Sequence, residues 1–295
     1  MVFFRHLTKS ALVHYQSLGQ FDEHLVSLYS LAYGRPYIYK DTYLAYYDKY
    51  SKILHLNFFE LHESENKFSF IQEAIKHFKP EKLVITAPHE MPQTVANFCC
   101  ISINKDTDYQ LYVADFDENL KGGKLKDVRY RVHNAEKRGY TLKISKKMTP
   151  AHFHIMAQHE HSKRLDLYDR QLYFAILDYL RKFKTPVLFD VVSDGSLLGF
   201  DLIDFLGDTM TVPLGFYNNA PSISDFIMFN EVKYAKQKGF TWLDLGWACN
   251  VGIEEFKKKW TAIPRFHIWT YEYVNNKLAA DLSDNKMENK RIGAV

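Results

Sequence analysis

Three strand-like runs follow one another with no helix-length segment between them, and this order restricts the fold more than any other feature. The runs are Val187 to Val192, Leu197 to Phe205 and Thr209 to Phe216. Asp194-Gly195, between the first two, is a strong signal for a tight hairpin turn, which joins antiparallel strands. A doubly wound parallel sheet needs a helix after each strand. The order therefore predicts a mixed sheet of the α+β class.

The segments on either side extend this layout. In the first part, helical spacing covers Phe21 to Tyr33 and Glu65 to His77, and strand patterns cover Tyr37 to Tyr47 (with a turn at Lys40-Asp41), Ile53 to Phe59 and Lys82 to Ala87. In the second part, strands are expected at Tyr109 to Val113, Tyr140 to Ser145 and Phe240 to Leu245, and helices at Leu125 to Arg138, Pro150 to Lys163, Asp169 to Phe183 and Ser224 to Lys238. Gly139 is expected to end the first of these helices in the left-handed conformation, and the last is expected to end at Gly239. Ser222 and Asp225 have the spacing of a capping box at the start of the last one.

Composition narrows the function classes. The chain has 295 residues, 46% of them apolar, and a net charge of +3, so we expect a folded protein and no globally basic nucleic-acid binder. Three cysteines, Cys99 and Cys100 being adjacent, do not make a disulfide framework. No run approaches the ~20 apolar residues of a membrane helix, and no signal peptide is recognised. We expect a cytoplasmic protein without a transmembrane segment, and peripheral membrane contact stays open.

Two short motifs carry a family resemblance. The first is Phe240 to Gly246, reading F-T-W-L-D-L-G, followed by Gly252 to Trp260, reading G-I-E-E-F-K-K-K-W. The second is the basic run from Val128 to Tyr140. Together they resemble the Fem-type aminoacyl transferases, which use charged tRNA, and the C-terminal domain of phosphatidylglycerol lysyltransferases. Both relatives have tandem lobes of the GNAT acyltransferase fold.

The resemblance implies a domain organisation. Residues 1–105 would form a degenerate N-terminal GNAT-like lobe, and residues 106–282 a C-terminal GNAT-like catalytic lobe. Each lobe would hold a mixed, mainly antiparallel sheet flanked by helices. Residues 283–295 are polar and aperiodic, so we expect a flexible tail.

Lys257 is the first candidate catalytic residue. Phe256-Lys257 matches the Phe-Lys pair of the Fem motif, so Phe256 is assigned to substrate binding and Lys257 to catalysis by resemblance. An ammonium beside the reacting carbonyl would stabilise the tetrahedral oxyanion of acyl transfer. The alternative is a solvated Lys-Lys-Lys face on a short helix.

The basic helix supplies candidate phosphate ligands. Arg131, Asn134 and Arg138 are spaced by three and four residues and so share one face. That face would bind tRNA or nucleotide phosphates through charge-assisted hydrogen bonds. The alternative is a solvated amphipathic helix whose buried stripe includes Val128 and Val132.

Three further polar residues are candidates in the strands. Asp201 lies among apolar neighbours, where burial would raise its pKa and let it accept a proton from the attacking ammonium. It is equally the outward residue of an alternating strand, with Asp204 on the other face. Tyr217 is a candidate to relay a proton or to hydrogen-bond the acyl donor. The alternative is an aromatic side chain that only packs. Asp244 is assigned to substrate binding by its motif, although a structural bond to backbone near the next loop is the favoured interpretation.

No metal site is predicted. His152, His154, His159 and His161 do not have the spacing of a two-histidine helical motif, because His159-Glu160 is followed directly by His161. Cys249 has no base nearby in sequence and is interpreted as incidental.

The predicted activity is N-acyl transfer onto an amine acceptor, which is a small molecule, lipid or peptide. No tightly bound cofactor is expected; the co-substrate is aminoacyl-tRNA, or acyl-CoA as the alternative. The place of the CoA pyrophosphate loop holds Asn218 to Ser222 without a glycine, which counts against CoA. The third possibility is a GNAT-like module that binds a nucleotide, tRNA or protein partner and does not react.

Overall fold

The computed structural model describes residues 4–61, 67–163 and 167–276, and these form two compact units. The first unit contains residues 4–8, 33–106 and 267–276, and the second contains residues 9–32 and 107–266. The units therefore interleave along the chain, whereas the division expected from sequence, 1–105 and 106–282, is linear. The expected tail, 283–295, lies outside the described residues.

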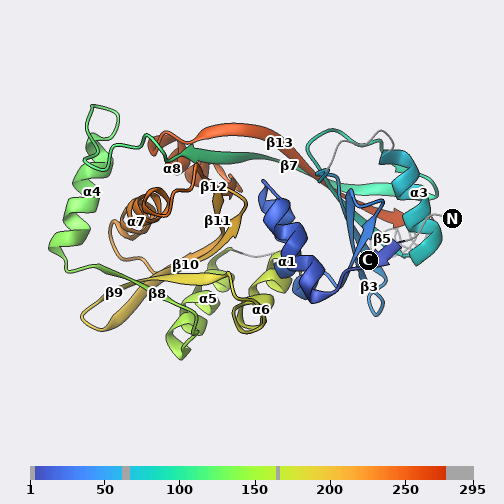
Figure 1. Cartoon of the computed structure of the whole chain (residues 1–295), viewed down its shortest axis with the longest axis horizontal. Helices are drawn as coiled ribbons and strands as arrows, with labels where there is room; N and C mark the ends of the chain where they lie inside the picture. Colours follow the sequence, from blue (N-terminus) through green and yellow to red (C-terminus); the bar gives the residue numbers. More distant parts are fainter. Residues whose placement is uncertain (1–3, 62–66, 164–166, 277–295) are drawn as a thin grey trace, which may run out of the picture. The chain divides into compact units, whose positions relative to one another are not determined.

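In the described residues, the first unit is a sheet with one helix packed against it (Figure 1). Its elements are β1 (Phe4–His6), β2 (Arg35–Tyr39), β3 (Tyr43–Asp48), β4 (Ile53–Asn57), α3 (Lys67–Phe78), β5 (Lys82–Ala87), β6 (Thr94–Val95), and parts of β7 (Phe98–Tyr112) and β13 (Ile263–Asn275). The strand order is β1-β2-β3-β4-β5-β13, and only β4 and β5 are parallel. The predicted turn at Lys40-Asp41 is confirmed, since both residues have positive φ.

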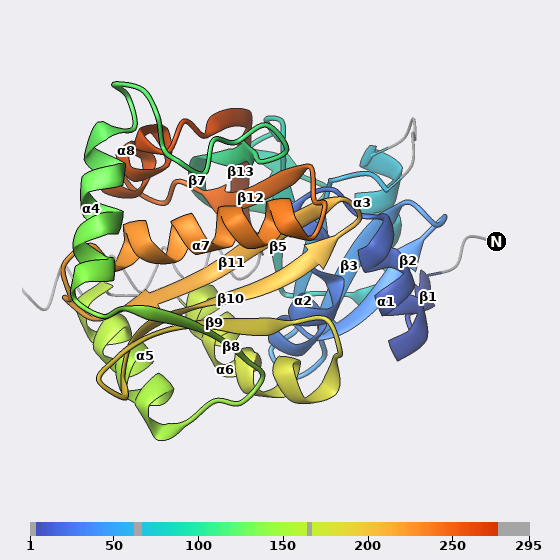
Figure 2. The same cartoon turned by 60° about the vertical axis from the view of Figure 1, so that its left-hand side comes forward.

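The second unit contains more of the described secondary-structure elements than the first (Figure 2). They are α1 (Lys9–Leu18), the 3-10 turn η1 (Asp22–His24), α2 (Val26–Ala32), the remainder of β7, α4 (Lys126–Lys137), β8 (Thr141–Ser145), α5 (Pro150–Lys163), α6 (Leu167–Lys182), β9 (Val187–Ser193), β10 (Ser196–Leu206), β11 (Thr209–Tyr217), α7 (Ile223–Gln237), β12 (Trp242–Trp247), α8 (Val251–Lys259) and the start of β13. The strand order is β7-β12-β11-β10-β9-β8, with β11 and β12 parallel and the other pairs antiparallel.

Helices cover both faces of this sheet. On β10, Phe200 packs against His152 of α5, while the next residue, Asp201, faces Glu231 of α7. Successive strand residues point to opposite faces, so α5 and α7 lie on opposite sides of β10, as Figure 1 shows. The α7 side holds the main core, to which α4 contributes Val128 and Val132.

Most predicted elements of the second unit are confirmed, because their periodicity is strong. Gly139 and Gly239 have positive φ just past α4 and α7. The capping box at Ser222 and Asp225 is wrong: Ser222 is in the left-handed region at φ 65° and its side chain caps nothing. The Asp225 carboxylate bonds to Trp260 and Lys259 instead.

The fold class expected from sequence, α+β with mixed and mainly antiparallel sheets, is confirmed. The helix expected from Phe21 to Tyr33 is wrong in its first part, where η1 and then α2 are found. Helix α1, Lys9–Leu18, is an element that the sequence patterns above do not include. Within the described parts of the chain, no helix combines the length and the hydrophobicity needed to cross a bilayer.

Candidate active site

The two parallel strands of the second unit separate after a short pairing. Residues Thr209 to Thr211 of β11 pair with Trp242 to Asp244 of β12, and the register ends there. On its other side, β12 has an irregularity against β7 between Asp244 and Trp247. Gly246 within it has φ 63°, a conformation that favours glycine. The carbonyl groups of Leu245 and Gly246 lie within this irregularity and need other partners.

Lys257 supplies those partners. Its ammonium lies 2.6 Å from the carbonyl oxygen of Leu245, 2.8 Å from that of Gly246 and 2.6 Å from that of Trp247. The side chain is buried, with 5% of the residue exposed, so the solvated interpretation is wrong for Lys257. An ammonium has three protons, and three backbone acceptors surround this one. Lys258, the next residue, is exposed and pairs with Glu254 at 2.8 Å.

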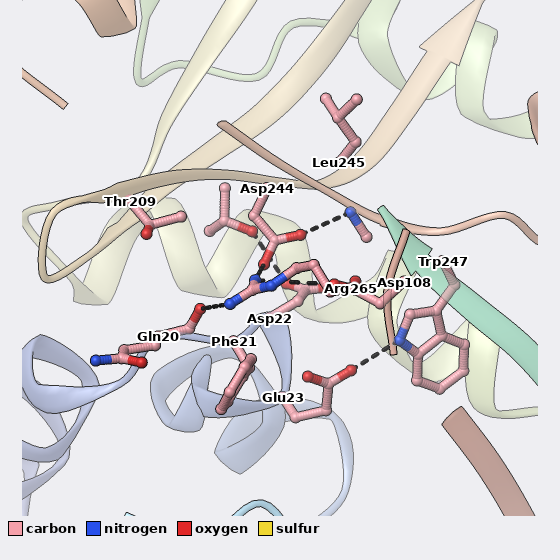
Figure 3. Close-up of polar contacts among 12 residues, drawn as sticks. Gln20, Phe21, Asp22, Glu23, Asp108, Thr209, Asp244, Leu245, Trp247 and Arg265 are labelled. Atoms are coloured by element: carbon pink, nitrogen blue, oxygen red, sulfur yellow. Dashed lines mark hydrogen bonds and ion pairs between the residues drawn. The ribbon is translucent and has the colours of Figure 1, made fainter. Parts of the chain in front are cut away.

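A cluster of carboxylates lies beside this strand end (Figure 3). Asp244 is fully buried; one of its oxygens accepts a bond from the Gly246 amide at 2.8 Å, and the other pairs with Arg265 at 3.1 Å. The predicted backbone bond of Asp244 is therefore present. Arg265 also donates to the carbonyl of Gln20 and stacks over the ring of Phe21, 4.6 Å from its centre.

Three more acids surround Asp244 and Arg265. Asp22 accepts a bond from the Thr211 hydroxyl at 3.3 Å, and Glu23 accepts one from the Trp247 indole at 2.7 Å. Neither carboxylate oxygen of Asp108 has a hydrogen-bond donor among the described residues, although Arg265 lies 3.8 Å from one of them. At most 8% of Asp22, Glu23 or Asp108 is exposed. We call Asp22, Glu23, Asp108 and Asp244 the acid cluster.

Burial and mutual repulsion favour the protonated forms of the acid cluster. Burial, with repulsion from Asp244 and Glu23, raises the pKa of Asp22 and of Asp108 well above the usual value. Burial raises the pKa of Glu23 to about 7. Burial also raises the pKa of Asp244, against the opposing effect of Arg265. The four acids face two cations, Arg265 and Lys257, so a further cation placed here would displace protons and be stabilised.

A second group of acids joins β10, β11 and α7. The Tyr217 hydroxyl donates to Asp201 at 2.5 Å, and Asp201 also shares a hydrogen bond with Glu231. Both acids are buried, so the outward interpretation of Asp201 is wrong. Burial raises the pKa of Asp201 to about 6 and that of Glu231 well above its usual value, with repulsion from Asp201 adding to the latter. Burial and repulsion thus favour a state in which the pair shares one proton.

The remaining predicted residues divide between two places. Arg131 and Phe256 line a cavity of about 390 Å³ at the start of α7. Asn134, half-buried, and Arg138, exposed, lie farther along α4 and do not line that cavity. Arg131 pairs with Asp127 at 2.8 Å and lies 3.8 Å from Asp225. The structure therefore brings Arg131 together with Phe256 of the α8 motif, while Asn134 and Arg138 do not line the same cavity.

The histidines have local structural roles where the structure describes them. His152 is 3% exposed, and its Nε2 lies 3.1 Å from Asp190 while its Nδ1 accepts the amide of Thr149. This arrangement fixes the start of α5 to β9. The side chain of His161 lies outside the described residues. Within the described parts of the chain, no three His, Cys, Asp or Glu residues converge in a way that would bind a metal.

Sequence reasoning missed most of the acid cluster. Asp22 and Glu23 were assigned to a helix, and Asp108 and Arg265 carried no motif. Their contact depends on the pairing of β12 with β7 and on the position of η1, which no local pattern specifies. One signal was present: Arg265 is a charged residue inside a strand that is otherwise largely aromatic and apolar, Ile263 to Asn275.

Solved structures share this fold at low identity. A C-terminal domain assigned to a lysylphosphatidylglycerol synthetase from Agrobacterium fabrum matches with a TM-score of 0.59 at 15% identity, covering 93% of this chain and 95% of that one. FemX matches with a TM-score of 0.56 at 15% identity, covering 84% and 86%. A tandem GNAT protein from the clavulanic acid pathway matches with a TM-score of 0.55 at 10% identity, covering 94% and 99%. No curated protein matches the chain in sequence.

The fold is therefore that of tandem GNAT proteins, and the resemblance expected from the two motifs is confirmed. The family model described as "Phosphatidylglycerol lysyltransferase, C-terminal" matches residues 39–280, which is most of the chain. The match includes both motifs and Asp108, Asp244, Lys257 and Arg265, while Asp22 and Glu23 precede it. The chain belongs to the family of phosphatidylglycerol lysyltransferase C-terminal domains.

Proposed function

We propose that this chain transfers an aminoacyl group from aminoacyl-tRNA to a small acceptor. The observation that carries the proposal is the acid cluster beside the end of β12 and Lys257. An aminoacyl group differs from an acetyl group in its α-ammonium, and a lysyl group carries a second ammonium on its side chain. A buried site with more carboxylates than cations stabilises such a group and gives an acetyl group no comparable gain.

Asp108 is the residue of the cluster best suited to receive an ammonium. Both of its oxygens are buried without a hydrogen-bond donor among the described residues, which is costly for a carboxylate. An incoming ammonium would supply donors to these oxygens and offset that cost. The raised pKa of Asp108 would then fall, since a cation beside a carboxylate favours its charged form.

The proposed reaction is attack of the acceptor on the ester carbonyl of aminoacyl-tRNA. A tetrahedral oxyanion forms, the ester C–O bond breaks, and the proton lost by the nucleophile ends on the 3′ oxygen of the tRNA. Lys257 would stabilise the oxyanion by exchanging one of its three carbonyl bonds for it. Asp201, with its pKa raised to about 6, is the proposed proton acceptor, and Tyr217 holds it in place.

The tRNA and the acceptor each need a binding surface. The exposed face of α4 is the proposed contact for tRNA phosphates, chiefly through Arg138 and Asn134. Arg131, on the same helix, is already held by Asp127 and lies near Asp225. The acceptor predicted from sequence is an amine, but the lipid named by the family, phosphatidylglycerol, presents hydroxyl groups. Either nucleophile fits the same acyl transfer, and a lipid acceptor implies peripheral contact with a membrane from a cytoplasmic position.

The test is a transfer assay with labelled donors. Purified protein is incubated with [¹⁴C]lysyl-tRNA, [¹⁴C]alanyl-tRNA or [¹⁴C]acetyl-CoA, each with phosphatidylglycerol vesicles or with a primary amine. We expect label to leave lysyl-tRNA for one of the acceptors, and Asp108→Asn to reduce the preference for lysyl over alanyl. Transfer from acetyl-CoA alone would overturn the proposal.

A second candidate is a binding module that does not react. It is favoured by one observation: all three acceptors around the Lys257 ammonium are carbonyl groups of the chain itself. Saturable tRNA binding with no transfer to either acceptor, at protein in excess of the donor, is the result that this candidate predicts.

A further inference from the structure

A cavity of about 390 Å³ opens at the first turn of α7, and no residue of the acid cluster lines it. Ser222, Ile223, Ser224 and Asp225 of that turn form one wall. Arg131 of α4 and four residues of α8 form much of the rest, namely Gly252, Glu255, Phe256 and Lys259. None of the residues assigned to catalysis lines it.

Three features of this cavity attract anions. The first turn of a helix presents backbone N–H groups and the positive end of the helix dipole. In α7 those groups are not capped by a side chain, because Ser222 adopts φ 65° and makes no capping bond. Arg131 and Lys259 add two positive charges at the same place. Such a combination ordinarily binds phosphate.

The chain fills this position with its own carboxylate. Asp225 is 4% exposed, and its Oδ1 accepts from the Trp260 indole at 3.0 Å and from the Lys259 ammonium at 2.5 Å. Its Oδ2 lies 3.8 Å from the guanidinium of Arg131. Asp225 also provides the acidic residue of the first turn, which complements the helix dipole. One buried anion therefore uses the helix end and both cations.

We infer that Asp225 is a specificity-determining residue, which reserves the Arg131–Lys259 pair and so excludes phosphate and pyrophosphate groups from this cavity. A pyrophosphate entering here would meet a buried negative charge whose partners are already engaged, and like charges at short range repel strongly. The other carboxylates nearby add to the exclusion: Asp127 pairs with Arg131, and Glu255 lies at the cavity wall. Donors that carry a pyrophosphate, such as a CoA thioester, are rejected at this helix.

Removing the charge should open a latent anion site. Asp225→Asn keeps the size of the side chain and a carbonyl acceptor for the Trp260 indole, but it removes the negative charge that pairs with Lys259 and lowers the negative potential at the helix end. Titration calorimetry with inorganic pyrophosphate, and separately with CoA, measures the change. We expect no saturable binding to the wild-type protein and binding to Asp225→Asn at least about tenfold tighter than the wild-type detection limit, the scale of a charge-assisted bond.

Two control variants test whether the gained anion binding depends on the release of Lys259 from its ion pair. Glu255→Gln removes one negative charge from the same cavity without freeing Lys259, and it should bind neither probe. Asp225→Asn combined with Lys259→Gln should lose the gained binding. Circular dichroism establishes that each variant is folded, and Asp225→Ser, whose hydroxyl accepts from Trp260, replaces the asparagine variant if that one is not.

The wild-type titration decides the inference even if no Asp225 variant folds. Saturable binding of pyrophosphate or CoA to the wild-type protein, weakened by Lys259→Gln, would overturn it. So would a folded Asp225 variant that gains no affinity for either probe. The inference concerns ligand binding at α7 and goes beyond aminoacyl transfer, so its failure would leave the proposed activity to its own assay.

Discussion

The ammonium of Lys257 lies 2.8 Å from the carbonyl oxygen of Gly246, at the point where β12 loses its regular pairing. The pairing of β11 with β12 ends at Thr211 and Asp244, two residues before Gly246. The side chain of Lys257, on α8, thus holds the end of β12 through bonds to backbone carbonyl groups. Its position, and the acid cluster beside it, are the physical basis for the predictions below.

The Asp201–Tyr217 bond depends on a glycine across the strand pair. A Cβ added at Gly215 would lie 2.5 Å from Oδ1 of Asp201 and 2.7 Å from the Tyr217 hydroxyl. Gly215→Ala should lower the free energy of unfolding by about 1–3 kcal/mol, the usual cost of overpacking. Gly123→Ala is the control, because its Cβ would meet nothing within 4 Å. Urea unfolding compares the two, and equal stability would mean that the Asp201 site is loosely packed.

Glu231 and Asp201 make stability depend on pH. The pKa of Asp201 is about 6 in the folded protein and 3.8 as its ordinary value, so the folded state binds more protons between these values. Stability from this pair is therefore present at low pH and is lost as pH rises through about 6. Glu231→Gln removes an acid that takes up a proton on folding, and with it a cost in stability that grows with pH. It should raise the melting temperature more at pH 8 than at pH 5, and an equal change at both would contradict a shared proton.

Glu23 gives the proposed reaction its own pH dependence. With a pKa of about 7, its carboxyl group is neutral below that pH and attracts a cation only above it. The kcat/KM for lysyl-tRNA should rise as pH increases through about 7, and Glu23→Gln should remove much of that rise. Alanyl-tRNA, which lacks the side-chain ammonium, is the control donor. Identical profiles for the two proteins with both donors would exclude Glu23 from donor recognition.

Helices, strands and turns can be predicted from the sequence where their pattern is local. The acid cluster cannot, because it depends on contacts between distant segments. The hairpin at Asp194-Gly195 and the glycines after α4 and α7 were recognised because turn chemistry and helical periodicity are encoded in neighbouring residues. The predicted capping box is absent because the Asp225 carboxylate makes tertiary contacts with Lys259 and Trp260. Lys257 was found through a motif, whereas Asp22 and Asp108 meet Asp244 only through long-range strand pairing.

The α4 prediction can be tested through salt. Each tRNA phosphate contact contributes a slope of about −0.7 to −0.9 to log affinity against log salt. Arg138→Glu should flatten the slope by about one contact, since Arg138 is exposed at the end of α4. Arg131→Glu should flatten it less, because Asp127 already pairs with that guanidinium. Filter binding across a salt series measures both, with Lys182→Glu on α6 as the matched charge reversal. Equal slopes in all three variants would remove α4 from the tRNA contact.

The most direct test of the account is a single-turnover measurement on Lys257 variants with labelled lysyl-tRNA. Lys257→Ala removes the ammonium, and Lys258→Ala removes an exposed one from the next residue. If Lys257 stabilises the oxyanion, its loss should slow the chemical step by about 10²–10³, with donor affinity little changed. Lys258→Ala should match the wild-type rate. A Lys257→Ala protein that is folded and reacts at the rate of Lys258→Ala, or that only binds the donor more weakly, would contradict the account.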